Sequence, residues 1–123
     1  MRLSVIAAAL LSVSCNAPER KTAGTAVPVV VGNRDNGKQL IEKYACLACH
    51  RIPGFDGAQG SLGPSLEGIT SHATIAGGAP NNVETMTAYL QNPQAVHPDA
   101  TMPALGMTPE EARDITAYLF TLK

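Results

Sequence analysis

The sequence predicts an all-α fold, and three observations support this prediction. Three segments carry apolar residues at the three- and four-residue spacing of a helix, and two of them begin at recognisable capping residues. The connections between them are rich in glycine and proline, and residues 51–80 alone contain seven glycines. No segment alternates apolar and polar residues in the way that a half-buried strand does, so we expect helices joined by loops.

The first helix is expected to begin at Gly37 and to run into Cys46. Either Asp35 or Asn36 can cap its start. A glycine near a helix start costs helix propensity, so we expect a close backbone crossing there, with the last helix of the chain as the partner. The apolar side of this helix consists of Leu40, Ile41, Tyr44 and Ala45.

The second helix is predicted from Asn82 to Asn92, and Pro93 is expected to stop it. Its buried line consists of Val83, Met86 and Leu90, with Tyr89 beside it. The third helix follows a capping box, Thr108-Pro109-Glu110-Glu111, with proline at the first helical position. Its apolar stripe consists of Ala112, Ile115, Tyr118, Leu119 and Leu122.

Residues 1–14 have the composition of an export signal. Arg2 precedes the apolar run 3–11, which is too short to span a bilayer as a permanent helix. The residues before Cys15 are similar to a bacterial lipoprotein box, so we expect this cysteine to be lipidated. Ordinary cleavage nearby, which would leave a soluble protein, is the alternative. Residues 15–34 then form a lipid-anchored or flexible tether, and residues 35–123 form the folded domain.

The motif Cys46-Leu47-Ala48-Cys49-His50 has the C-x-x-C-H spacing of covalent attachment of a c-type haem. Two thiols can bond the two vinyl groups of one porphyrin, and the histidine that follows can bind its iron. A thioredoxin-type pair would require alternating strands and helices around it, and a zinc site would require a second close pair of ligands. The sequence shows neither pattern, so we expect one covalent haem, held by Cys46 and Cys49.

The length of the chain fits a single domain, and its small number of aromatic residues fits a core that is completed by a cofactor. The 123 residues include no Trp, two Phe and three Tyr, which is few for a self-sufficient core, and a haem would add apolar packing surface. The formal net charge is −1, so we expect no nucleic-acid partner.

The second axial ligand has five candidates, which are Met86, Met102, Met107, His72 and His97. Met86 lies on the apolar stripe of a predicted helix, which favours a place in the core. Met107 precedes the Thr108 cap and suits a hydrophobic staple. Met102 lies in a loop before Pro103, which restricts the local backbone and so favours Met102 as the ligand.

Taken together, His50 after Cys46 and Cys49, the loop 63–66, and Met102-Pro103 ahead of the final helix resemble a class I cytochrome c. The resemblance covers about residues 36–123 and implies that fold, with three main helices around one covalent haem. It further implies thioether links at Cys46 and Cys49, and His50 and Met102 as axial ligands. Pro64 would accept a hydrogen bond from His50. The segment 92–103 is also similar to cytochrome c domains that accompany haem–copper oxidases.

The expected function is therefore one-electron transfer in a respiratory chain, without enzymatic activity. The work would take place on the periplasmic side of a bacterial membrane, between redox protein partners that include a terminal oxidase. Two alternatives stay open, which are a fixed haem subunit of a membrane oxidase or dehydrogenase complex and a gas-binding haem with an open sixth position. The dispersed charge predicts partner docking with weak dependence on salt.

Overall fold

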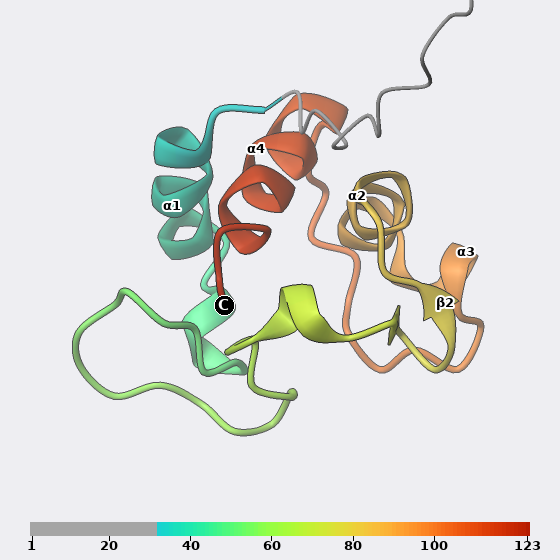
Figure 1. Cartoon of the computed structure of the whole chain (residues 1–123), viewed down its shortest axis with the longest axis horizontal. Helices are drawn as coiled ribbons and strands as arrows, with labels where there is room; N and C mark the ends of the chain where they lie inside the picture. The colour runs from blue at the N-terminus through green and yellow to red at the C-terminus, as the bar shows by residue number, and fades with distance from the viewer. Residues whose placement is uncertain (1–31) are drawn as a thin grey trace, which may run out of the picture.

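The computed structural model describes residues 32–123, so the expectations for the signal peptide, Cys15 and most of the tether lie outside the described residues. Figure 1 shows helices connected by long loops, which confirms the all-α prediction. The elements in chain order are α1 (Arg34–Lys43), the 3-10 turns η1 (Cys46–Ala48) and η2 (Ile69–Ser71), the strands β1 (Thr74–Ile75) and β2 (Ala79–Pro80), α2 (Val83–Gln91), α3 (Pro93–Val96) and α4 (Pro109–Leu119). The two strands form one small antiparallel hairpin. None of the helices within residues 32–123 has the length and apolar character needed to cross a bilayer.

Helix α1 begins earlier than the sequence pattern indicated, and Asn33 is its cap. The side-chain oxygen of Asn33 accepts hydrogen bonds from the backbone N–H groups of Asp35 and Asn36, at 3.0 and 3.1 Å. The prediction that Asp35 or Asn36 caps a helix starting at Gly37 is therefore wrong. One asparagine oxygen satisfies two free N–H groups, which stabilises an extra turn before Gly37.

The same helix also ends before the cysteine motif. Its last residue is Lys43, and Ala45 then adopts a left-handed conformation with φ of 52°. A non-glycine residue in that region interrupts a right-handed helix. Cys46 therefore begins the separate turn η1, and the expectation of one continuous helix into Cys46 is wrong.

Helix α4 lies between α1 and α2 and organises the core (Figure 1). The crossing with α1 occurs at Gly37, where an added Cβ would overlap the carbonyl oxygen of Asp114. The carboxylate of Asp114 accepts hydrogen bonds from the Asn33 N–H and the Asn36 amide, at 2.7 and 2.6 Å. The predicted close crossing of the first and last helices is confirmed.

The capping box of α4 is present as predicted. The hydroxyl oxygen of Thr108 accepts from the Glu111 N–H, and the Glu111 carboxylate accepts from the Thr108 N–H. The backbone N–H groups of Thr108 and Glu111, which have no partner within the helix, are thus both hydrogen-bonded. The buried core contains Leu40, Ile41, Ile52, Ile69, Met86, Leu90, Met107, Ala112, Ile115, Leu119 and Leu122.

Helix α2 begins beside its predicted start, and Asn82 caps it, because the Asn82 side chain accepts from the Thr85 N–H at 2.8 Å. Helix α2 ends at Gln91, before Pro93 as predicted, and Pro93 then opens the short helix α3. Asn92 both terminates α2 and caps α3, and proline is well suited to the first helical position because it has no N–H to satisfy. The ring of Pro93 is fully buried, so α3 is anchored against the core.

Candidate functional site

The cysteine motif forms a tight turn at the end of the loop that follows α1. The N–H groups of Cys49 and His50 both donate to the carbonyl oxygen of Cys46, at 3.2 and 2.9 Å. The two cysteines are half-buried and are not joined to each other in a disulfide. Burial raises the pKa of the Cys46 thiol. The turn thus places the sulfur-bearing residues Cys46 and Cys49 one turn apart, with His50 directly after the second of them.

His50 is held by the loop that carries Pro64. Its Nδ1 lies 2.8 Å from the carbonyl oxygen of Pro64. A carbonyl can only accept, so Nδ1 carries the proton in this contact. In a neutral imidazole the other nitrogen, Nε2, then has a free lone pair, which is the form that binds a metal. The contact thus defines both the ring orientation and the nitrogen that remains available.

The neighbouring glycine makes this contact possible. A Cβ added to Gly63 would lie 2.6 Å from Nδ1 and 2.9 Å from Nε2 of His50, so the imidazole occupies the space that a side chain would take. The N–H of Gly63 donates to the Cys49 carbonyl at 2.8 Å. Gly60 donates in the same way to Leu47, also at 2.8 Å. The loop is therefore attached to the backbone of the cysteine motif at Gly60 and Gly63.

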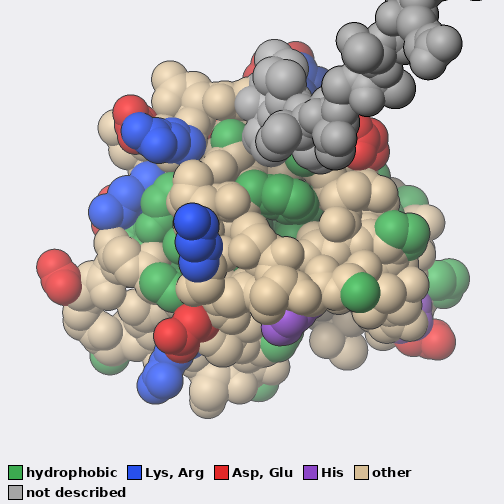
Figure 2. Space-filling model, in the orientation of Figure 1, with side chains coloured by type: hydrophobic (Ala, Val, Ile, Leu, Met, Phe, Trp, Pro, Cys, Tyr) green, Lys and Arg blue, Asp and Glu red, His purple; other side chains and the backbone are tan. Residues whose placement is uncertain are grey.

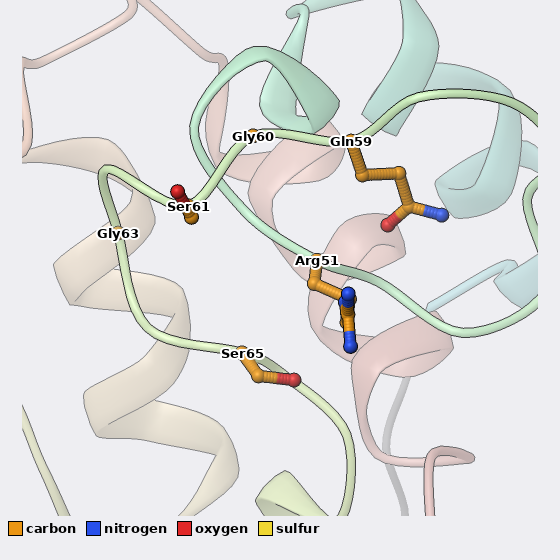
Figure 3. Close-up of a pocket in the computed structure, with 6 residues that line it drawn as sticks. All are labelled: Arg51, Gln59, Gly60, Ser61, Gly63 and Ser65. Carbon is orange, nitrogen blue, oxygen red and sulfur yellow. The ribbon is translucent and has the colours of Figure 1, made fainter.

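A shallow pocket of about 340 Å³ lies in this loop region. Figure 3 shows that its six lining residues all belong to segment 51–65, and that the side chains of Arg51, Gln59 and Ser65 come from different stretches of it. The Gln59 amide is already bonded to the Ile52 N–H and the Phe55 carbonyl, so it supports the loop. None of the residues predicted to hold a haem lines this pocket.

Met102 comes from a different part of the chain, the segment without helix or strand between α3 and α4. It is half-buried and packs against the core. The other candidates are placed differently. Met86 and Met107 are buried in the core, and His72 is exposed. The ring of His97 lies against Gly77, where an added Cβ would meet it at 2.8 Å.

The structure thus joins Cys46, Cys49, His50 and Pro64 through hydrogen bonds, whereas Met102 belongs to a separate segment. The residues present fit a haem by their chemistry. The donor set comprises two thiols, an imidazole with one free nitrogen and a thioether. Half-buried apolar side chains also pack against the core and offer the kind of surface that an apolar macrocycle would cover; they include Cys46, Leu47, Leu66, Ile75, Met102 and Leu105.

A charged network fastens the end of α1, just before the motif, to the start of α4. The Glu111 carboxylate accepts from Lys43 Nζ and from the Tyr44 hydroxyl, both at 2.6 Å. These bonds, with that from Thr108, lower the pKa of Glu111 to about 2. The hydrogen bond to Glu111 raises the pKa of Lys43 and of Tyr44. The backbone that leads into Cys46 is thereby tied to α4.

Sequence reasoning missed several of these supporting residues. The capping-box pattern identified Glu111, but its bonds to Lys43 and Tyr44 bridge 68 and 67 positions, which no local pattern reveals. Gln94 donates to the carbonyls of Ala100 and Met102, and a single glutamine gives no advance signal of such bonds in the sequence.

Comparison with known proteins gives two oxidase relatives. The chain is 32% identical over 90 residues to cytochrome c oxidase subunit 2 of Alkalihalophilus pseudofirmus, which covers 72% of this chain and 25% of that protein. It is 28% identical over 108 residues to cytochrome c oxidase subunit 2 of Bacillus sp. strain PS3, covering 85% and 30%. The chain thus spans about a quarter to a third of the length of these relatives.

A structural comparison finds cytochrome c2 from Rhodobacter capsulatus, with a TM-score of 0.47 and 23% identity over 72% of this chain and 96% of that one. The family model described as cytochrome c matches residues 35–123, which is well over half of the chain. This match confirms the resemblance read from the cysteine motif and the final helix. The chain belongs to the cytochrome c family of electron-carrying proteins with covalently bound haem c.

Proposed function

We propose that this protein is a one-electron carrier with a single haem c, attached through Cys46 and Cys49 and ligated by His50 and Met102. The observation that carries the proposal is the 2.8 Å contact between His50 Nδ1 and the Pro64 carbonyl. Because that contact occupies Nδ1, it leaves Nε2 as the ligating nitrogen directly after the two cysteines. A hydrogen bond of this kind also orients a ligating histidine and increases its basicity.

The placement of the rival candidates supports Met102 as the distal ligand. Met86 and Met107 are 5% and 6% exposed and fill the core, so their thioethers serve packing. His97 is packed against Gly77. Met102 is half-buried in a loop and is followed by Pro103, so its position is restricted without the side chain being enclosed.

In this proposal the chain supplies attachment, ligation and an apolar surrounding, and bound haem c supplies the one-electron couple. His50 and Met102 fill both axial positions, so no substrate has to bind the metal. A methionine opposite a histidine raises the reduction potential relative to two histidines. The half-buried apolar side chains bordering the core would keep water from the ligands. We propose no enzymatic activity.

Surface charge supports docking that depends weakly on salt. Figure 2 shows Lys and Arg side chains at separate places on the side of the molecule where α1 lies, with acidic side chains beside several of them and others elsewhere on this face. Interspersed charges create a weak long-range field, so electrostatic steering of a partner is small. Transfer rates to a redox partner should change only a few-fold between about 0.01 and 0.15 M ionic strength, and a steep fall would contradict this docking mode.

The proposed place of work is outside the cytoplasmic membrane, in a respiratory chain. Its support is the export-type composition of residues 1–14 and the lipoprotein-like residues before Cys15. Lipidation at Cys15 would hold the carrier at the periplasmic membrane surface. Mass analysis of the amino-terminal peptide from the mature protein tests this, because an unmodified or absent Cys15 would leave a soluble periplasmic carrier instead.

The experiment on the haem site compares Met102→Leu with Met107→Leu in the purified holoprotein. Both changes replace a thioether by a side chain of similar volume, so folding should survive. We expect Met102→Leu to abolish the weak far-red sulfur-to-iron band of the ferric spectrum, to permit carbon monoxide binding by the ferrous protein and to lower the midpoint potential. Met107→Leu should retain all three properties. If Met102→Leu has the spectrum and potential of the wild type, Met102 is not the ligand.

A second candidate function is that of a fixed haem subunit in an oxidase complex. The observation in its favour is that both curated relatives are oxidase subunits of which this chain matches only a part. Co-purification with an oxidase from detergent-solubilised membranes at raised salt would favour the fixed subunit. Release of the cytochrome alone would favour the mobile carrier.

A further inference from the structure

We infer that Gln94 is a positioning residue for the distal ligand, holding the Met102 loop closed through its side-chain amide. This inference rests on the proposed role of Met102. The Gln94 Nε2 donates to the carbonyl oxygen of Ala100 at 2.9 Å and to that of Met102 at 2.8 Å. An amide nitrogen has two hydrogens, so both are used in this one loop. The Met102 backbone is thereby tied to α3.

Gln94 lies on a short helix that is anchored to the core. It is the second residue of α3, and the residue before it, Pro93, is fully buried. The Asn92 side chain caps the same short helix by accepting from the Ala95 N–H at 3.3 Å. A hydrogen-bond donor on an anchored helix can restrain a loop, whereas a donor on a mobile segment would move together with the loop and restrain nothing.

Few other hydrogen bonds restrain the backbone of this loop, although the side chain of Met107 near its end is buried in the core. Residues 97–108 contain no helix or strand, and Pro98 and Pro103 have no N–H to donate. Within residues 32–123, Gln94 is the one side chain that donates hydrogen bonds to the backbone of segment 98–107. The other hydrogen bond within the loop runs from the Ala100 N–H to the His97 carbonyl, at 2.9 Å. Core packing holds the Met107 end of the loop, and the Gln94 amide supplies the hydrogen bonds that hold the backbone at Ala100 and Met102.

The size of the effect follows from the exposure of Gln94. Its side chain is solvent-exposed, so each bond exchanges with water and contributes at the low end of the usual range. The loss of both bonds should increase the population of the opened loop about ten-fold, which corresponds to ~1.4 kcal/mol. A competing ligand binds only the opened form, so its apparent affinity should rise by the same factor. Exposure also means that substitution leaves the core intact.

The experiment titrates the ferric holoprotein with imidazole and follows the loss of the sulfur-to-iron band. The variants are Gln94→Leu, which removes both donors, and Gln94→Glu, which replaces them with an acceptor. The matched controls are Gln39→Leu and Gln39→Glu, because Gln39 on α1 is exposed like Gln94 and its side chain makes no hydrogen bond within the described chain. We expect both Gln94 variants to bind imidazole about ten-fold more tightly than wild type, and both Gln39 variants to bind it with the wild-type affinity.

Two results would overturn the inference while leaving the carrier function in place. One is unchanged imidazole affinity in both Gln94 variants, with the sulfur-to-iron band intact. The other is a lower unfolding temperature in these variants without a change in imidazole affinity, which would assign Gln94 a purely structural role. A wild-type spectrum that already lacks the sulfur-to-iron band, and that Met102→Leu does not alter, would overturn both the ligand assignment and the inference.

Discussion

A substitution at the crossing of α1 and α4 changes the stability of the fold through two effects of opposite sign. Gly37 lies inside α1, and replacing it by alanine should favour the helix by about 1 kcal/mol if propensity alone decides. The new Cβ, however, would lie 2.5 Å from the carbonyl carbon of Asp114 and 3.0 Å from the N atom of Ile115, and closer still to the Asp114 oxygen. We expect the steric cost at the crossing to exceed the gain in helix propensity, so Gly37→Ala should destabilise the protein.

The magnitude follows from the distances at the crossing. Ordinary contact for a Cβ begins at 3.4 Å, so the carbonyl carbon alone requires the two helices to separate by about 0.9 Å (3.4 − 2.5). The partner is backbone, which cannot rotate out of the way. Overpacking of this kind costs about 1–3 kcal/mol, and the upper end applies where the neighbour is rigid. Subtracting about 1 kcal/mol of propensity leaves about 2 kcal/mol of net destabilisation.

Thermal unfolding of the holoprotein, followed by circular dichroism, measures this difference. A loss of about 2 kcal/mol should lower the Tm by about 8–16 °C in a domain of this size. Gln39→Ala on the exposed side of the same helix is the control and should change stability by no more than about 0.5 kcal/mol. If Gly37→Ala unfolds at a higher temperature than wild type, propensity outweighs packing and the close crossing does not exist in solution.

Two further predictions concern the loop beside His50 and the acid stability of the fold. Gly63→Ala should displace the imidazole from Pro64 and reduce the yield of low-spin holoprotein, while Gly57→Ala, whose Cβ would meet nothing within 4 Å, should strain only its own loop; equal spectra and yields would refute the packing argument. The lowered pKa of Glu111, about 2 against 4.5, means that its carboxylate stabilises the fold above pH 4.5 and that this contribution is lost as the pH falls from 4.5 to about 2. Glu111→Gln should therefore flatten the acid-unfolding curve in that range, and a curve parallel to that of wild type would contradict the role of the ion pair with Lys43.

The elements that could be predicted from the sequence are those whose signals are local. The capping box at Thr108 needs residues only three positions apart, and the structure contains it. The spacing of apolar residues on one helix places Met86 in the core, and its side chain is 5% exposed there. The position of Gly37 indicated the helix crossing because only a missing side chain lets two backbones approach so closely.

The start and end of α1 were not predictable to the same degree. Asn33 competes with Asp35 and Asn36 as a cap, and all three residue types favour that position, so local preference does not rank them. The bonds from Asn33 and Asn36 to Asp114 at the far end of the chain add to the choice, and they exist only once α4 has packed.

The sequence by itself determined the chemistry of the attachment motif, the all-α character and the family, because these depend on residue types at short spacing. Tertiary structure decided which groups support that chemistry. The Pro64 carbonyl meets His50 across 14 positions, and Glu111 meets Tyr44 across 67. Gln94 holds the Met102 backbone across a segment without regular structure. Such bonds carry no sequence period of their own, since they form only where the packed helices bring a donor and an acceptor together.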